Sequence, residues 1–344
     1  MGKKSKNSTP GEDFLALPAH SSTASIVDTH THLASTFEFY RSKYKAGKYE
    51  DVFDFVKGMY RGKRVEAIID VWCEAPIQRI WKEFADSAVS EEDRKTKWGG
   101  LEYWFVMGVH PHNAKDYTDQ IEAEILEAMT HPRCVGWGEM GLDYHYDNSP
   151  REIQQQVFAR QLRHAVRLGK PLTIHTREAN DDTERILKEI VPKEHPIHIH
   201  CFTDEPEFGQ RLLDYFPNLY IGVTGVITFS TNLNTSAIVR NMVPASSSPE
   251  SIPSKFRILL ETDAPYMVPA NIYNSIKPIN GQVMKGRLPL SHSAMIPWTA
   301  DFVVDGFKSD SSSGNGNEDE NNVPVDVDLV MSVARENAKK VYGV

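Results

Sequence analysis

Residues 134–178 read CVGWGEMGLDYHYDNSPREIQQQVFARQLRHAVRLGKPLTIHTRE, and this stretch decides the fold. Its first part, Cys134–Glu139, is a nearly continuous apolar run, which predicts a strand buried on both faces. A second apolar run at Pro171–His175 predicts another such strand. Between them, Ser149–Leu168 carries apolar residues at helical spacing and is followed by Gly169, a residue type that commonly ends helices. Strand, helix and strand in this order indicate a βαβ unit with parallel strands.

The predicted helix has a recognisable start. Ser149 can cap the first turn, Pro150 suits the first helical position, and Glu152 completes an S-x-x-E capping box. An apolar stripe then follows one face and consists of Ile153, Val157, Phe158, Leu162, Ala165 and Val166. We therefore expect this face to pack against the neighbouring strands.

The same alternation continues in both directions along the chain. Eight strands are predicted in total, at Ser25–His30, Glu66–Cys73, Tyr103–Val109, Cys134–Glu139, Pro171–His175, Pro196–His200, Leu219–Gly225 and Phe256–Glu261. Further helices are predicted at Asp119–Met129, Asp182–Ile190, Glu207–Tyr215 and Leu329–Tyr342. Eight alternating strand and helix units are typical of a single (β/α)₈ TIM barrel, which is the α/β fold that we expect.

Three stretches look like surface insertions in this barrel. Thr36–Arg64 is rich in charge and aromatic residues, Asp86–Gly100 has the composition of a solvated loop, and Lys308–Asn322 is of low complexity. We expect residues 1–24 to form a flexible tail and residues 25–344 to form the barrel domain, with a disordered insertion at 308–322.

The composition is that of an ordinary globular protein with an acidic balance. The chain has 344 residues, with 38 Lys and Arg against 47 Asp and Glu, which gives a formal net charge of −9. This balance argues against a protein that coats nucleic acid by charge alone, but not against an enzyme that meets phosphate through cations. No apolar run approaches the roughly 18 residues of a membrane span, and no secretory signal is recognisable. We therefore expect a cytoplasmic and/or nuclear protein with no membrane association and no obligate protein partner.

Almost every predicted strand ends in a histidine or an acid. The strand-end motifs are DTHTH, VHPH, GEMGLD, IHTR, IHIH and ETD. Active sites of TIM barrels lie at the carboxyl ends of the strands. Six of these side chains are therefore expected to meet in one cavity, namely His30, His32, Glu139, His175, His200 and Asp263.

Four imidazoles and two carboxylates make a mixed set of nitrogen and oxygen ligands. Such a set suits one or two divalent ions of the Zn, Mn, Mg or Fe type better than calcium, which prefers oxygen alone. A catalytic zinc takes about three protein ligands, so six candidates favour two ions, which a carboxylate such as Glu139 can bridge. Two ions roughly 3.5–4 Å apart can clamp both the attacking and the leaving oxygen of a phosphoryl displacement.

The motifs and their order resemble those of the TatD-like family of metal-dependent deoxyribonucleases, within the wider amidohydrolase-type TIM barrels. The matching motifs are DTHTHL, GVHPH, GEMGLDY, IHTRE, HCF and ETDAP, which span Ile26–Pro265, and ENAKKVYG near the C-terminus matches more loosely. The resemblance implies a phosphodiesterase that hydrolyses DNA with a water activated by two divalent ions, for which Mg, Mn and Zn are the candidates.

The resemblance also implies a role for each of the six residues. Two pairs of histidines would bind one ion each, His30 with His32 and His175 with His200. Glu139 would bridge the two ions, and Asp263 would bind the first ion and orient or deprotonate the water. Glu139 and Asp263 are therefore the expected catalytic residues.

Other residues beside the motifs have two interpretations each. His112 and Arg177 are candidates for phosphate contacts, with a hydrogen bond toward a helix and a salt bridge at the rim as the alternatives. Asp143 and Glu261 are expected to hydrogen-bond the metal-binding imidazoles. Four aromatic residues either stack nucleobases or are buried in the barrel rim, namely Phe202, Tyr144, Tyr146 and Tyr266.

One departure from the family pattern follows the HCF motif. The family commonly has a small residue and then a glycine there, whereas this chain has Thr203 and Asp204. Asp can adopt the left-handed conformation of a turn glycine, so we expect the fold to survive. A carboxylate at this rim could, however, repel phosphate or change the choice of substrate.

Two other classes of function stay open at this point. An amidohydrolase or phosphotriesterase-like enzyme would use the same six metal ligands to hydrolyse a small molecule. Phosphotriesterase-like relatives commonly have a carboxylated lysine at the end of the fourth strand, whereas Glu139 stands there in this chain, which favours the nuclease. A catalytically silent barrel that serves as an interaction module is the third possibility, and the six intact ligand candidates argue against it.

Overall fold

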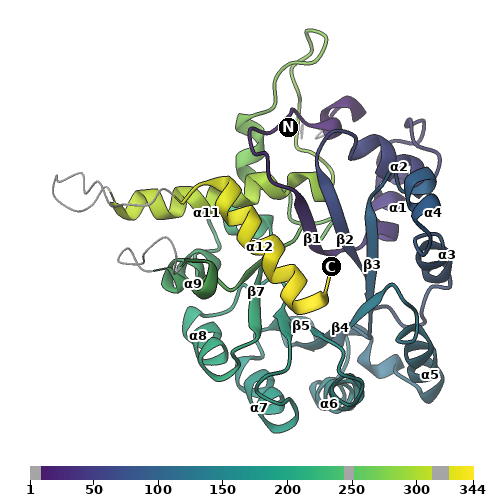
Figure 1. Cartoon of the computed structure of the whole chain (residues 1–344), viewed down its shortest axis with the longest axis vertical. Coiled ribbons are helices and arrows are strands. Elements are labelled where there is room, and N and C mark those ends of the chain that lie inside the picture. The colour runs from purple at the N-terminus through teal and green to yellow at the C-terminus, as the bar shows by residue number, and fades with distance from the viewer. Residues whose placement is uncertain (1–8, 244–251, 312–324) are drawn as a thin grey trace, which may run out of the picture.

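The computed structural model describes residues 9–243, 252–311 and 325–344, and a parallel β-barrel lies at its centre (Figure 1). Eight strands pair in sequence order. They are β1 (Ile26–Thr31), β2 (Val65–Trp72), β3 (Glu102–Met107), β4 (Cys134–Asp143), β5 (Leu172–Arg177), β6 (Ile197–Ile199), β7 (Leu219–Val223) and β8 (Ile258–Leu260). The eight strands predicted from apolar runs are confirmed, although their ends shift by a few residues.

Backbone contacts between β1 and the segment after β8 close the barrel. The amide of Asp263 donates to the carbonyl of His30 at 2.9 Å, and the amide of His32 donates to the carbonyl of Ala264 at 2.9 Å. Thr31 and Ala264 also form a parallel bridge. The fold is therefore the predicted (β/α)₈ TIM barrel, and the carboxyl ends of its strands meet at one mouth.

Helices follow the strands and surround the barrel (Figure 1). They are α1 (Leu33–Lys43), α2 (Val52–Met59), α3 (Ile80–Asp86), α4 (Glu91–Lys97), α5 (Asp119–Ala128), α6 (Arg151–Leu168), α7 (Asn180–Ile190), α8 (Pro206–Tyr215), α9 (Asn234–Met242), α10 (Ile252–Lys255), α11 (Ile296–Ser311) and α12 (Val327–Tyr342). The predicted helices are confirmed as α5, α6, α7, α8 and α12. Within the described ranges, none of the helices has the combined length and apolarity needed to cross a membrane.

The start of α6 differs from the predicted capping box. The helix begins at Arg151, and no side chain caps it. The Ser149 hydroxyl has tertiary partners instead, since it donates to the carbonyl of His112 at 2.8 Å and accepts the amide of Lys115 at 3.0 Å. The capping prediction is therefore wrong, because these contacts use Ser149 to hold the loop that carries His112.

For two of the three predicted insertions, the prediction of a surface loop is wrong, because these stretches contain helices that cover the barrel. Thr36–Arg64 includes most of α1 and all of α2. Tyr40 and Phe55 in this stretch are fully buried, with ring centroids 5.2 Å apart. Asp86–Gly100 includes α4 and the buried Trp98. Buried aromatic side chains anchor both stretches to the barrel, although most residues of α4 are charged.

The predicted flexible tail at residues 1–24 is wrong for residues 9–24, which pack against the barrel. Leu15 is fully buried, and its carbonyl oxygen lies 3.0 Å from Nε2 of the buried His292. Residues 1–8 lie outside the described residues. The folded domain thus begins earlier in the chain than residue 25.

The predicted disordered insertion at 308–322 lies mostly outside the described residues. Its first residues are helical, because α11 continues to Ser311. Residues 312–322 are not among those described, so the prediction stays open for them.

Replacing Leu15 with alanine should destabilise the protein by about 2–4 kcal/mol, because the change leaves a cavity in a fully buried site. Urea unfolding followed by circular dichroism measures the change. Leu168→Ala is the matched control, since Leu168 is 41% exposed at the end of α6. Equal unfolding midpoints for the two variants would contradict the packing of residues 9–24 against the barrel.

Candidate active site

The six side chains expected to meet do lie together at the mouth of the barrel. They come from β1 and the residue after it, from β4, from β5, and from the residues that follow β6 and β8. Short contacts join them across the mouth, with 3.3 Å between Nε2 of His30 and Nε2 of His32. The rings of His30 and His200 stack with centroids 3.5 Å apart. Residues up to 233 positions apart in sequence are therefore neighbours, as the barrel topology requires.

Glu139 lies between two groups of imidazoles. Its Oε2 atom is 3.5 Å from Nε2 of His30 and 3.8 Å from Nε2 of His32. Its Oε1 atom is 2.8 Å from Nδ1 of His175 and 3.7 Å from Nε2 of His200. Each carboxylate oxygen thus faces a different pair of histidines.

Asp263 belongs to the side of the site that holds His30 and His32. Its Oδ1 atom is 3.4 Å from Nε2 of His32 and 3.9 Å from Nε2 of His30. His30, His32 and Glu139 offer ligand atoms that all lie within 4.8 Å of one another, and so do His30, His200 and Asp263. These sets of three mixed nitrogen and oxygen ligands fit a divalent cation of the transition-metal type.

A glycine after Glu139 lets β4 present this residue beside β5. The pairing of β4 with β5 is irregular between Trp137 and Met140, on either side of Glu139. Gly141 has a φ of +151°, and a Cβ atom there would lie 1.9 Å from the carbonyl oxygen of His175. A side chain at this position would therefore push apart the strands that carry Glu139 and His175.

The imidazoles keep the buried Glu139 carboxyl ionised. Burial alone would raise its pKa, but the facing imidazoles of His110 and His200 hold that pKa well below its usual range. On the side of Glu139 that holds His30 and His32, burial opposes protonation of His32. The Asp263 carboxylate nevertheless raises the pKa of this histidine to about 9. An ionised carboxylate is the form that binds a cation.

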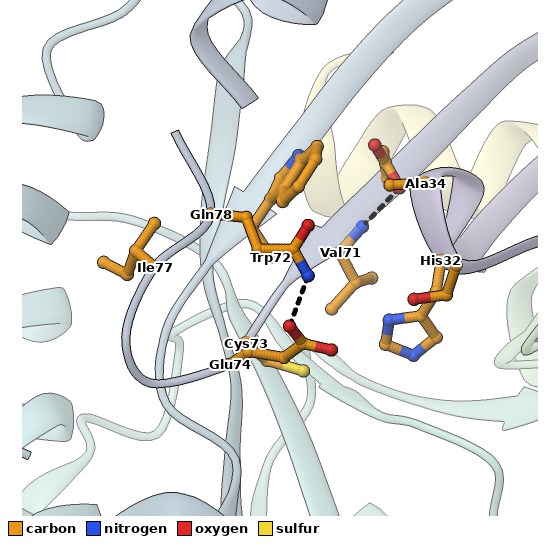
Figure 2. A pocket seen from close by; sticks show the side chains of 10 residues that line it. His32, Ala34, Val71, Trp72, Cys73, Glu74, Ile77 and Gln78 are labelled. Atoms are coloured by element: carbon orange, nitrogen blue, oxygen red, sulfur yellow. Dashed lines mark hydrogen bonds between the residues drawn. The ribbon is translucent and has the colours of Figure 1, made fainter. Parts of the chain in front are cut away.

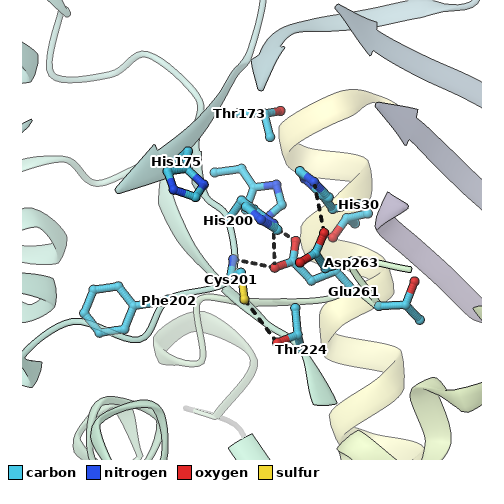
Figure 3. A network of polar contacts seen from close by, with 12 residues as sticks. His30, Thr173, His175, His200, Cys201, Phe202, Thr224, Glu261 and Asp263 are labelled. Carbon is cyan, nitrogen blue, oxygen red and sulfur yellow. Dashed lines mark hydrogen bonds and ion pairs between the residues drawn. The ribbon is translucent and has the colours of Figure 1, made fainter. Parts of the chain in front are cut away.

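Two further carboxylates contact the imidazoles of His175 and His200 on the other side of Glu139, as expected. Oε1 of Glu261 lies 3.2 Å from Nδ1 of His200 and accepts the amide of Cys201 at 2.6 Å (Figure 3). Asp143 places Oδ2 3.4 Å from Nε2 of His175. Neighbouring carboxylates of this kind fix the ring orientation of metal-binding histidines.

His112 and Arg177 line the wall of a cavity at the mouth of the barrel. This cavity lies over the six predicted ligands, which are called the cage below, namely His30, His32, Glu139, His175, His200 and Asp263. Nε2 of His112 is 2.9 Å from Oδ2 of Asp143, so its partner is a carboxylate of the site and not a helix. The guanidinium carbon of Arg177 lies 5.0 Å from the ring centroid of Tyr146. Both side chains are therefore positioned where a substrate can reach them.

Two site residues lie outside the predicted set. Nε2 of His110 is 3.5 Å from Oε1 of Glu139, and His110, Glu139 and His175 form a third group of possible ligands. The signal for His110 is the first histidine of VHPH, which ends the third predicted strand. Cys73 also borders the site, with Sγ 3.6 Å from Oε2 of Glu139.

Asp70 is a third missed residue, and it fixes the turn that carries His32. A small pocket beside His32 is lined by Cys73 (Figure 2) and also by Asp70. The Asp70 carboxylate accepts the amide of Leu33 at 2.8 Å and the hydroxyl of Tyr103 at 2.8 Å. Nothing in the sequence around Asp70 marks it, because it lies inside a strand and not at a strand end.

Asp204 does not take the place of a turn glycine. The left-handed conformation in this loop occurs at Cys201, which has a φ of +43°. Asp204 is buried, and its Oδ1 atom accepts the amide of Glu178 at 3.2 Å. The residue therefore braces the segment after Arg177. The fold survives as expected, although Asp204 does not adopt the left-handed conformation.

Replacing His110 with alanine should lower hydrolytic activity roughly 10- to 100-fold, the range for residues that support metal ligands. The reason is its position beside both Glu139 and His175: its Nε2 lies 3.5 Å from Oε1 of Glu139, and its ring centroid lies 4.5 Å from that of His175. His131→Ala is the control, because His131 precedes β4 at the opposite end of the barrel. Equal activity of the two variants would show that His110 has no part in the site.

A cavity of about 990 Å³ opens over the cage. Its floor includes Glu139, His175, His200 and Asp263, and its walls come from the loops that follow the strands. This volume lies near the upper end of the roughly 300–1,000 Å³ range of small-molecule sites. The open mouth leaves room for a substrate larger than the part that reaches the cage.

Comparison with known proteins agrees with this arrangement. The family described as TatD related DNase matches residues 27–343. The human "3'-5' RNA nuclease TATDN2" is 42% identical over 174 residues, which are 50% of this chain and 21% of that protein. The Bacillus subtilis "Uncharacterized metal-dependent hydrolase YabD" is 30% identical over 247 residues, or 71% of this chain and 82% of that protein.

Solved structures show the same fold. A TatD family hydrolase from Entamoeba histolytica superposes with a TM-score of 0.68 at 18% identity, over 94% of this chain and 99% of that one. The match to residues 27–343 covers every predicted metal ligand. The chain belongs to the TatD-related DNase family.

Proposed function

We propose that this chain is a metal-dependent nuclease that hydrolyses the phosphodiester bonds of DNA or RNA. The observation that carries the proposal is the placement of Glu139, whose two oxygens face two separate pairs of imidazoles below an open cavity. The family description supports DNA as the substrate, and the name of the human relative adds RNA and the 3′-to-5′ direction.

Each residue of the cage has a role in this proposal. His30, His32 and Asp263 would hold one divalent ion, and His175 and His200 would hold a second. Glu139 would contact both ions through its two oxygens. When bound, two such ions supply positive charge to the phosphate and lower the pKa of the attacking water. Mg, Mn and Zn all suit this set of ligands.

The chain's own groups would position the substrate and move the proton. The Asp263 carboxylate lies beside His32 at the floor of the cavity, where it would accept the proton of the attacking water. His112 and Arg177 line the wall of the same cavity and would contact phosphate oxygens. Asp143 would keep His112 oriented for that contact.

A small-molecule hydrolase is the second candidate function. The cavity volume of about 990 Å³ is compatible with a compact ligand, and the same cage would polarise a carbonyl or a phosphotriester. Glu139, in place of a carboxylated lysine, favours the nuclease. The convergence of all six ligand candidates disfavours a catalytically silent interaction module.

Cleavage of labelled strands tests the proposal. Single-stranded DNA, duplex DNA and RNA with a 5′ label are incubated with protein that has been stripped of metal and then given Mg²⁺, Mn²⁺ or Zn²⁺. We expect metal-dependent shortening from the 3′ end. Hydrolysis of lactones or organophosphates with no cleavage of any strand would favour the small-molecule enzyme instead.

Cytoplasmic or nuclear localisation and the lack of an obligate protein partner stay predictions.

A further inference from the structure

Two exposed tyrosines stand at the mouth of the cavity. Tyr146 is 48% exposed and Tyr266 is 59% exposed, and both line the cavity over the cage. The other two aromatic candidates do not line this cavity. Phe202 is buried. Tyr144 is half-buried and lines a different pocket, where its hydroxyl is bonded to Asp182 at 2.8 Å. The structure thus separates two rings that line the cavity from two that do not.

Tyr146 is held in place by the site itself. Its amide donates to Oδ1 of Asp143 at 3.0 Å, and Asp143 contacts His175 through its other oxygen. The Arg177 guanidinium carbon lies 5.0 Å from the ring centroid, and the His112 ring packs edge-on at 5.7 Å. The ring is therefore oriented before any substrate arrives, which lowers the entropy cost of binding.

Tyr266 is the counterpart of Tyr146 on the other side of the mouth. Its amide donates to the carbonyl of Asp263 at 2.9 Å. Each tyrosine thus follows a carboxylate of the site by three residues, Asp143 in one case and Asp263 in the other. Tyr146 follows β4 and Tyr266 follows β8, and these strands lie opposite each other in a closed eight-stranded barrel.

We propose that Tyr146 and Tyr266 stack against nucleobases on the two sides of the phosphate that is cleaved. This inference rests on the proposed nuclease function and adds the feature of the substrate that is recognised. Every base has a flat face that can stack on an aromatic ring, so the contact tolerates any sequence. Bases in a duplex already stack on each other, so the two tyrosines favour a single-stranded or frayed end.

The test compares two single-stranded DNA substrates of equal length and 5′ label. One carries ordinary nucleotides throughout, and the other carries abasic tetrahydrofuran units at its 3′ end. We expect the metal-loaded wild type to prefer the ordinary strand. Tyr146→Ala and Tyr266→Ala should each lower kcat/KM for the ordinary strand by roughly 10-fold or more. The fall for the abasic strand should be clearly smaller, because that strand has no bases at its 3′ end to stack. Tyr146→Phe and Tyr266→Phe keep the ring and should retain most of the preference.

The outcomes separate this inference from the proposed function. Equal cleavage of both strands by the wild type would overturn the stacking role while leaving the nuclease intact. An equal loss on both strands in the alanine variants would also overturn it, because it would show a general defect. No cleavage of either strand by the wild type would refute the proposed cleavage of DNA itself. Leu168→Ala, on the end of α6, is the control for loss of an exposed apolar side chain.

Discussion

Replacing Glu139 with glutamine is expected to lower kcat/KM for strand cleavage by roughly 10³-fold or more, beyond the 10- to 100-fold typical of residues that only support a ligand. Glutamine keeps the volume but has no negative charge and only one oxygen. Its amide cannot face His30 and His175 as ligand oxygens at the same time. We therefore expect the variant to lose bound metal together with its activity.

Metal content and activity are measured on the same Glu139→Gln preparation. The matched control is Glu124→Gln, since Glu124 is on α5 with Gln120 as its side-chain partner. Circular dichroism confirms that both variants are folded. Unchanged cleavage by Glu139→Gln would remove the bridging role, and normal metal content without activity would limit Glu139 to the chemical step.

Replacing Asp263 with asparagine should abolish turnover while part of the metal is kept. The asparagine carbonyl can still occupy the place of Oδ1, which is 3.4 Å from Nε2 of His32. The amide cannot accept a proton from water, and loss of a general base typically costs about 10²–10⁴-fold in rate. Single-turnover cleavage separates this chemical defect from binding.

Metal analysis of Asp263→Asn distinguishes the two possible roles of the residue. The expected result is retention of at least part of the metal with a large fall in kcat. Complete loss of metal would instead show that Asp263 is mainly a structural ligand. Full activity would exclude it from both roles.

The barrel was predictable because its signals are local. Each buried strand is a short apolar run, and α6 has a clear apolar stripe that ends at Gly169. Parallel strands place their carboxyl ends together, so motifs far apart in sequence could be assigned to one mouth. His30, Glu139 and Asp263 lie together for this reason.

The helices in the two charged stretches were not predictable in the same way. In α1 and α2, burial depends on Tyr40 and Phe55, which pack against each other and against the barrel. Ser149 has the sequence of a cap but uses its hydroxyl to bond the loop of His112. In these cases a tertiary contact overrides the local pattern, and the local pattern cannot show which partner is present.

The supporting residues of the site were also only partly predictable. Asp143 and Glu261 lie within recognisable motifs, and both contact imidazoles as expected. Asp70 lies in the middle of β2 and acts through the backbone of Leu33, a contact that depends on the pairing of β1 with β2. His110 was visible at a strand end, but its distance from Glu139 comes from the curvature of the barrel.

Anomalous diffraction from crystals loaded with Mn²⁺ tests the central claim most directly. The account predicts two peaks roughly 3.5–4 Å apart, one on each side of the Glu139 carboxylate. The first peak should contact His30 and His32, and the second should contact His175 and His200. A single peak, or two peaks that Glu139 does not touch, would contradict the proposed two-ion site.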